Sequence, residues 1–238
     1  RLWVPASFPR PNDPGHSTAV GTLAASLAQA VGGRTFVLTT TLRALPTIAE
    51  ALSAAAAFGD AGLEVLVQGS QPRRALLQRY GDGRGKVLVG SQSFWEGIDM
   101  PGDALQCVVI DKLPFPPPND PLVEARVRQL EARQRNAFTD YFVAEAAIAL
   151  KQGSGRLIRT ETDRGLLVVC DPRLRQMNYG ARLRSAMPPM TLLPPFRVSV
   201  PWAGPVTSEA AFVPELLTLS LPSTPATATV RAVSMRVA

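Results

Sequence analysis

The segment Arg34-Thr-Phe-Val-Leu-Thr39 decides the fold, because after Arg34 it is a short unbroken run of apolar and β-branched residues. A strand with one solvent-exposed face alternates apolar and polar residues, whereas a strand buried on both faces is almost continuously apolar. Four further runs of the same kind follow along the chain, at residues 63–67, 86–90, 105–110 and 165–170. These runs predict strands of a sheet that is covered on both sides.

The segments between these runs have the composition of helices. Helices are expected at residues 19–31, 40–58, 71–80, 122–131 and 140–151. Strands that alternate with helices indicate a parallel sheet between two helical layers, so the predicted fold is a three-layer α/β domain over residues 19–190. Residues 1–18, with four prolines, are expected to form an extended lead-in. Residues 191–238 are rich in Pro, Ser, Thr and Ala, and we expect a poorly ordered tail.

Composition limits the classes of function. The chain has 238 residues and a net charge of +6, and all of its basic residues except three lysines are arginines, which is consistent with a nucleic-acid partner. No apolar run has the length of a membrane span, so we expect a cytoplasmic protein without membrane contact. Cys107 and Cys170, the only cysteines, lie in apolar runs and predict buried thiols, which excludes a four-cysteine zinc or iron–sulfur site within this chain. His16 lies in a Pro/Asp/Gly-rich segment and is expected to be solvated, without a functional role.

Polar residues follow several of the predicted strands. Thr39 and Thr40 follow the first run, Gln68 the second and Ser93 the third, and Asp111-Lys112 follow the fourth. In parallel α/β folds, ligands bind where the loops after the carboxyl ends of the strands meet. The sequence therefore predicts a binding edge that includes these residues.

The loop from Gly90 to Gly102 contains two acidic residues, Glu96 and Asp99, on either side of Gly97. A pair of carboxylates on one turn suits general acid–base chemistry or metal binding. An acidic loop that bonds to neighbouring backbone and orders a cleft fits the same residues. The residues themselves leave both interpretations open.

The octet Gln152-Gly-Ser-Gly-Arg-Leu-Ile-Arg159 carries the most specific chemical signal. On a helix, Gln152, Arg156 and Arg159 are spaced i, i+4 and i+7 and form one stripe. Two guanidinium groups on one stripe suit a polyanion such as a triphosphate, and an ordinary solvated basic face fits them equally well. Residues 150–185 have a net charge of +5, which favours an anionic partner.

A phosphate loop of the form G-x-x-x-x-G-K-[ST] is absent from the chain. The nearest approach, Gly81 to Val87, is one residue too short, ends in Val87 where a metal-binding hydroxyl is needed, and precedes a strand. No acidic box that would hold the magnesium of a nucleotide follows a strand. We therefore expect no metal site in this chain.

Taken together, these segments resemble the second motor domain of XPD-like superfamily-two DNA helicases, in the DinG/YoaA branch. Residues 34–40 are similar to motif IV of that family, residues 90–102 to motif V and residues 152–159 to motif VI. Residues 109–115 and 163–173 are similar to the family's sequence between and after these motifs. The five blocks occur in the family's order and cover roughly residues 1–190. The resemblance implies a RecA-like domain.

The resemblance also implies a role for each site. Arg156 and Arg159 would contact the γ-phosphate of ATP, and Gln152 would orient the nucleotide or water. Glu96, Gly97 and Asp99 would couple the ATP cleft to the DNA track, where Thr39, Thr40, Gln68 and Ser93 would contact single-stranded or forked DNA. ATP and Mg²⁺ would be held mainly by an N-terminal motor domain, which carries the phosphate loop, the acidic box and, in many members, an iron–sulfur cluster.

The sequence thus predicts the C-terminal half of an ATP-dependent helicase of the DNA-repair or replication type. Because the phosphate loop and acidic box are absent, we expect this chain to be a fragment with almost no ATP hydrolysis of its own. The alternative is a stand-alone nucleic-acid-binding module or adaptor that has kept the fold and lost the motor.

Overall fold

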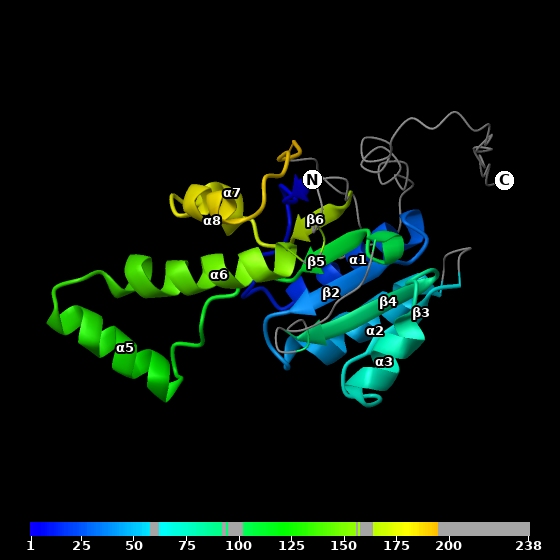
Figure 1. Cartoon of the computed structure of the whole chain (residues 1–238), viewed down its shortest axis with the longest axis horizontal. Helices are drawn as coiled ribbons and strands as arrows, with labels where there is room; N and C mark the ends of the chain where they lie inside the picture. Colours follow the sequence, from blue (N-terminus) through cyan, green and yellow to red (C-terminus); the bar gives the residue numbers. More distant parts are fainter. Residues whose placement is uncertain (58–61, 92–93, 95–101, 156, 158–163, 195–238) are drawn as a thin grey trace.

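The computed structural model describes residues 1–57, 62–91, 94, 102–155, 157 and 164–194. These residues form a six-stranded sheet in the order β1-β6-β5-β2-β4-β3, and all neighbouring strands are parallel. The predicted α/β fold with a parallel central sheet is confirmed (Figure 1). The strands are β1 (Leu2–Trp3), β2 (Thr35–Thr39), β3 (Glu64–Val67), β4 (Lys86–Ser91), β5 (Cys107–Ile110) and β6 (Leu166–Val169).

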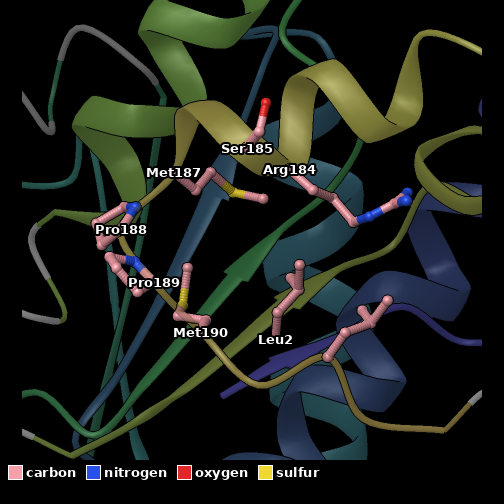
Figure 2. A pocket seen from close by; sticks show the side chains of 8 residues that line it. Leu2, Arg184, Ser185, Met187, Pro188, Pro189 and Met190 are labelled. Atoms are coloured by element: carbon pink, nitrogen blue, oxygen red, sulfur yellow. The ribbon is translucent and has the colours of Figure 1, made fainter.

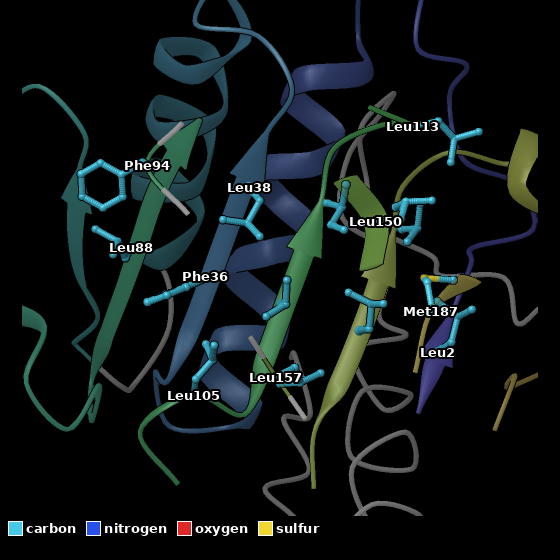
Figure 3. Packing of buried hydrophobic residues seen from close by; sticks show 14 of the residues in the cluster. Leu2, Phe36, Leu38, Leu88, Phe94, Leu105, Leu113, Leu150, Leu157 and Met187 are labelled. Carbon is cyan, nitrogen blue, oxygen red and sulfur yellow. The ribbon is translucent and has the colours of Figure 1, made fainter. Parts of the chain in front are cut away.

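Helices cover both faces of the sheet. One face packs against α1 (His16–Ala30) and α2 (Ala44–Ala56), and the other against α3 (Arg73–Tyr80), α6 (Val143–Ser154), α7 (Arg173–Gln176) and α8 (Gly180–Ala186). Successive residues of a strand point to opposite faces, so Val37 joins the core under α1 and α2 while Phe36 and Leu38 join the other core (Figure 3). Both cores need apolar side chains, which explains the unbroken apolar runs.

Helices α1 and α2 approach each other closely at Gly21. A methyl group added at Gly21 would lie 2.5 Å from the carbonyl oxygen of Ile48 and 2.8 Å from the side chain of Ala51. The small residue lets the two helix backbones meet above the sheet.

Helix α5 (Pro121–Ala132) projects away from the sheet beside the start of α6 (Figure 1). Asp120 caps it by accepting hydrogen bonds from the backbone N–H groups of Leu122 and Val123, and Pro121 is its first residue. A turn of π-helix, η2 (Phe138–Phe142), leads into α6. The ring of Phe138 lies 5.8 Å from that of Phe115 and 5.4 Å from that of Tyr179, measured between ring centroids. These aromatic contacts attach η2, and with it the connection from α5 to α6, to the rest of the domain.

Two boundaries differ from the predicted ones. The lead-in 1–18 contains β1, an edge strand whose Trp3 is fully buried, and α1 already begins at His16. The predicted tail 191–238 begins with residues that belong to the fold, since Leu193 is buried and its N–H donates to the carbonyl of Leu2 at 2.8 Å. Both differences arise because two-residue pairings at the edge of a sheet leave no periodic pattern in the sequence. Residues 195–238 lie outside the described residues.

Candidate functional site

The carboxyl edge of the sheet carries a bonded cluster centred on Asp111, the first residue after β5. Its carboxylate accepts hydrogen bonds from the backbone N–H of Thr40 at 2.9 Å, from the backbone N–H of Lys112 at 2.7 Å and from the hydroxyl of Thr40 at 3.3 Å. Strands β2 and β5 are neighbours, so residues 71 apart in sequence meet here. Asp111 thereby fixes the loop that begins with Thr40.

Burial changes the acidity of Asp111. The side chain is almost completely buried, and loss of hydration raises the pKa of its carboxyl from 3.8 to about 6. Smaller effects lower this pKa: the hydrogen bonds from the Thr40 and Lys112 backbone and the charges of Lys112 and His16. At neutral pH the carboxylate is therefore ionised, and its negative charge lies behind the Thr40 loop.

The structure brings Thr39, Thr40 and Gln68 to this edge, as predicted, and it assigns them different environments. Thr39 is buried and its hydroxyl donates to the carbonyl of Thr41 at 3.1 Å, whereas Thr40 is partly exposed. The side-chain oxygen of Gln68 accepts a hydrogen bond from the backbone N–H of Ser91 at 2.6 Å and so joins the ends of β3 and β4. Ser93 lies outside the described residues.

A second buried carboxylate, Asp171, lies after β6 and was not identified from the sequence. It accepts hydrogen bonds from the backbone N–H of Leu113 at 3.0 Å and from a guanidinium nitrogen of Arg173 at 2.7 Å. The Arg173 guanidinium also lies 5.6 Å from the centre of the Phe115 ring. An aspartate directly after a buried apolar run, as at Asp111, is the sequence signal that could have indicated it.

His16 is buried, contrary to the expectation of a solvated loop residue. Its side chain is 3% exposed, and both ring nitrogens lie within hydrogen-bonding distance of backbone carbonyl oxygens. The prediction was wrong because the ring reaches the carbonyl oxygen of Pro9 in the segment before it and that of Asp111, directly after β5. Polar loop composition gives no indication of that tertiary contact.

Gln152 lies in the last turn of α6, at the opposite edge of the sheet, and its side chain is exposed. Helix α6 runs antiparallel to the strands, and Leu157, just beyond it, packs against Gly165 immediately before β6. Figure 3 places Leu157 and Leu105 near the beginnings of the strands, whereas Leu38 and Leu113 lie near their ends. The fold therefore does not bring Gln152 together with Thr40 and Gln68.

The predicted helical stripe through Gln152, Arg156 and Arg159 does not continue along α6, which ends at Ser154. The Ser154 hydroxyl donates to the carbonyl of Leu150 at 2.7 Å, and Gly155 follows as the cap. Serine and glycine are weak helix formers, which fits the end of the helix at this point. Arg156 and Arg159 themselves lie outside the described residues.

Glu96, Gly97 and Asp99 also lie outside the described residues, but the positions of their neighbours are informative. Phe94 is buried beside Gly90 of β4, near the carboxyl edge. On the other side of the segment, the short 3₁₀ helix η1 (Gly102–Ala104) lies at the amino edge, where the Tyr80 hydroxyl donates to the carbonyl of Ala104 at 2.8 Å. The described residues on either side of 95–101 thus lie at opposite edges of the sheet.

A cavity of about 340 Å³ lies beside β1 (Figure 2). Its walls come from Leu2, from Arg184 and Ser185 of α8, from residues 187–190 and from Leu192. None of the predicted site residues lines it. The lining is mainly methionine, proline and leucine, and it offers no constellation of polar groups for chemistry.

The residues that the structure describes contain no cluster of three or more His, Cys, Asp or Glu side chains arranged to bind a metal ion. Within the same residues, no helix combines the length and the apolar character needed to cross a bilayer.

Comparison with known proteins adds the family context. Residues 24–190 match the family described as the helicase C-terminal domain. The ATP-dependent DNA helicase YoaA of Escherichia coli (strain K12) is 39% identical over 188 residues, which is 79% of this chain and 29% of that protein. The ATP-dependent helicase DinG of Mycobacterium tuberculosis (strain H37Rv) is 39% identical over 189 residues, which is 79% of this chain and 28% of that protein. The chain thus spans less than a third of the length of these relatives.

Solved structures show the same fold. An XPD helicase structure superposes on 81% of this chain and 35% of its own with a TM-score of 0.56, at 18% sequence identity. The Xpd4 structure from S. tokodaii gives the same TM-score at 17% identity, over 81% of this chain and 38% of its own. At this level of identity the likeness establishes the architecture alone.

Proposed function

This chain belongs to the helicase C-terminal domain family, and from that membership we propose that it is the second motor domain of an ATP-dependent DNA helicase. The observation that carries the proposal is the family match over residues 24–190, together with relatives named as ATP-dependent helicases. We expect the domain to act in the cytoplasm on single-stranded or forked DNA, in repair or replication. It would do so together with an N-terminal motor domain.

We assign the ATP side to the amino edge. Arg156 and Arg159 would contact the γ-phosphate, and Gln152, exposed at the end of α6, would orient the nucleotide or the attacking water. In phosphoryl transfer, charge spreads over the phosphoryl oxygens in the transition state, so fixed guanidinium groups lower the barrier electrostatically. Mg²⁺ and the remaining phosphate contacts would come mainly from the other motor domain, and by itself this chain would hydrolyse almost no ATP.

We assign the DNA side to the carboxyl edge. Thr40 is partly exposed there, and the Asp111 carboxylate holds the backbone of its loop in one conformation. Hydroxyl, amide and backbone N–H groups bind phosphates without reading the base sequence, which suits a translocating motor. Thr39, Gln68 and Ser93 would complete this track. Because Thr39 and Gln68 bond to the backbone, their contribution would be to shape the loops.

Glu96, Gly97 and Asp99 would couple the two sides. They belong to the segment whose described neighbours lie at opposite edges of the sheet. A segment attached at both edges can transmit a change at the phosphate to the DNA track. This interpretation favours a coupling role for the two carboxylates over an independent acid–base or metal pair.

The decisive experiment measures DNA-stimulated ATP hydrolysis of the complete protein encoded by the reading frame that contains this chain. Removal of an arginine that contacts the transferred phosphoryl group lowers the rate by a factor on the order of 10³–10⁵, so Arg156→Ala and Arg159→Ala should each cause such a loss. Arg126→Ala is the matched control, because Arg126 is an exposed arginine on the projecting helix α5. Unchanged ATP hydrolysis in both variants would remove the arginines from the site.

The same experiment tests the alternative of an adaptor without motor activity. An adaptor would bind single-stranded DNA with the salt dependence of phosphate contacts, and its binding would not respond to ATP. A motor would hydrolyse ATP faster when DNA is added. DNA binding without DNA-stimulated hydrolysis in the wild-type protein would favour the adaptor.

A further inference from the structure

Four aromatic side chains from three separate segments meet beside the carboxyl edge of the sheet. They come from the segment after β5, from η2 and from the turn between α7 and α8, and we call them the aromatic cluster: Phe115, Phe138, Phe142 and Tyr179. Phe138 is the central ring. Its centroid lies 5.8 Å from that of Phe115, 5.4 Å from that of Tyr179 and 6.4 Å from that of Phe142.

The aromatic cluster is partly open to solvent. Phe138 is 45% exposed, and the other three rings are only half-buried. A single exposed apolar side chain is ordinary on a protein surface, whereas a group of partly exposed rings marks an interaction site. The cluster therefore both attaches η2 to the domain and presents aromatic surface to a ligand.

A buried carboxylate fixes one side of the aromatic cluster. Asp171 is fully buried, and its carboxylate accepts hydrogen bonds from Nε of Arg173 at 3.0 Å and from Nη2 at 2.7 Å. These bonds hold the guanidinium 5.6 Å from the centre of the Phe115 ring. The same carboxylate accepts the backbone N–H of Leu113 at 3.0 Å, so it also holds the segment that carries Phe115. The surface is thus pre-organised, and a ligand would not have to order it.

Basic groups accompany the rings. The guanidinium of Arg182 donates to the carbonyl of Thr139 at 3.0 Å and forms no salt bridge with a carboxylate among the described residues. The nearby Asp140 is paired with Arg135 at 2.8 Å. Arg173 uses Nε and Nη2 for its carboxylate, which leaves the N–H groups of Nη1 without a described partner. Aromatic surface beside free guanidinium donors suits a ligand that combines flat rings with negative charges, as single-stranded DNA does.

The aromatic cluster lies within reach of the strand that we propose for the Thr40 loop. Asp171 follows β6 and Thr40 follows β2, and β5 lies between these two strands. Neighbouring strands are about 4.8 Å apart, so the two strand ends are separated by roughly 10 Å. Figure 1 places the start of α6 beyond the carboxyl ends of the strands. A single strand of a few nucleotides can therefore contact both places.

We propose that the aromatic cluster is a stacking platform for the bases of single-stranded DNA, with Phe138 as the ring on which a base stacks. This inference rests on the proposed function, in which the Thr40 loop contacts the phosphates of the same strand. Stacking tolerates every sequence because each base has a π-face, which suits a translocating motor. Arg173 and Arg182 donate to the phosphates on either side of the stacked base.

Two oligonucleotides of equal length separate base contacts from phosphate contacts. One is an oligothymidylate, and the other carries the same phosphates on abasic sugars. Fluorescence anisotropy measures the affinity of both for the complete protein encoded by the reading frame that contains this chain. The base dependence, defined as the ratio of the two affinities, responds to stacking, whereas contacts to phosphates or a loosened fold affect both affinities alike.

Phe138→Leu keeps an apolar side chain and removes the ring. Stacking of a base on an aromatic ring contributes a factor of about 5–150 to affinity. We expect the base dependence to fall by such a factor, with unchanged affinity for the abasic strand, and Phe138→Trp should preserve it. Ile148→Ala is the matched control, because it removes a 53% exposed apolar side chain of α6 outside the cluster. Equal base dependence in the wild type and in Phe138→Leu would overturn the proposal.

Photo-cross-linking locates the base without any substitution in the protein. In a strand that carries 5-iodouracil in place of thymine, ultraviolet light joins the base to an aromatic side chain that stacks on it. Mass spectrometry of the digested wild-type complex should find such an adduct on Phe138 or on Tyr179. Adducts confined to residues outside the aromatic cluster would overturn the platform and leave the rings as an anchor of η2 or a contact to the other motor domain.

The platform and the proposed function fail in different ways. A wild-type protein that binds neither oligonucleotide would refute the proposed action on DNA, and the platform with it. A wild-type protein that binds both strands, with affinities that Phe138→Leu lowers by the same factor, would refute stacking, because Phe138 would then act only through the fold. The proposed function would stand in that case.

Discussion

The carboxylate of Asp111 can be tested by two substitutions that differ in which hydrogen bonds they keep. Its Oδ1 accepts both the Thr40 and the Lys112 backbone N–H groups, while Oδ2 faces the hydroxyl of Thr40. In Asp111→Asn, the amide oxygen can take the place of Oδ1, and the amide nitrogen can donate to the hydroxyl. Asp111→Ala removes both acceptors and leaves two backbone donors without partners.

The magnitudes follow from these contacts. Two unsatisfied donors at about 1–3 kcal/mol each predict that Asp111→Ala lowers the free energy of unfolding by roughly 2–6 kcal/mol. For Asp111→Asn, the size of the change in unfolding free energy depends on the pH. The folded pKa of the carboxyl, about 6, lies above its usual value of 3.8, so the stability that the wild-type carboxyl contributes is present below pH 3.8 and is lost as the pH rises through 6. This shift corresponds to roughly 3 kcal/mol in favour of asparagine between pH 3.5 and pH 7.

Urea unfolding followed by far-ultraviolet circular dichroism measures both effects, at pH values from 3.5 to 7.5. The quantity of interest is the difference in unfolding free energy between the wild type and Asp111→Asn, because contributions from titrating groups that do not interact with Asp111 cancel in it. A difference that stays constant over this range would refute the raised pKa of Asp111. An alanine variant as stable as the asparagine variant would refute the hydrogen bonds.

Three further predictions concern packing, and the same urea unfolding measures each of them. Gly21→Ala should lower the unfolding free energy by about 1–3 kcal/mol, since the new methyl group would overlap the backbone of α2, whereas Gly15→Ala, with open space around it, should stay within about 0.5 kcal/mol. Tyr80→Phe should cost about 1–3 kcal/mol by leaving the buried carbonyl of η1 without its donor, and an unchanged value would argue against that bond. Leu157→Ala should cost about 2–5 kcal/mol, because the side chain is buried, and Leu122→Ala, 77% exposed, is its control.

The sheet could be predicted from the sequence because its signal is local. Residues 36–38 and 87–89 are unbroken apolar runs, and the structure has β2 at Thr35–Thr39 and β4 at Lys86–Ser91. Burial on both faces requires such runs, and turns bound each of them. The edge strand β1 gave no such signal, because two residues that pair with β6 have no periodicity to detect.

The environment of the site could be predicted less completely, because it depends on contacts between distant segments. The sequence placed Thr40 and Asp111 after two different strands, but only the order of β2 and β5 in the sheet makes them partners. His16 was misjudged for the same reason, since its partner Asp111 is 95 residues away. The composition around a residue describes its neighbours along the chain and not its neighbours in space.

The separation of the two edges constrains how a motor built on this domain can work. A strand rises about 3.3 Å per residue, so β4, with six residues, places the loops that we propose to contact DNA roughly 20 Å from the amino edge. Electrostatic attraction between exposed charges is largely screened over such a distance at physiological ionic strength. The phosphate of ATP therefore cannot act on the Thr40 loop directly. Coupling has to pass through covalently continuous or tightly packed elements, and residues 94–102 and helix α6 connect the two edges. Substitutions at Glu96 or Asp99 should accordingly lower the stimulation of ATP hydrolysis by DNA more than they lower the basal rate. An equal loss of both rates would assign these carboxylates to the ATP cleft alone.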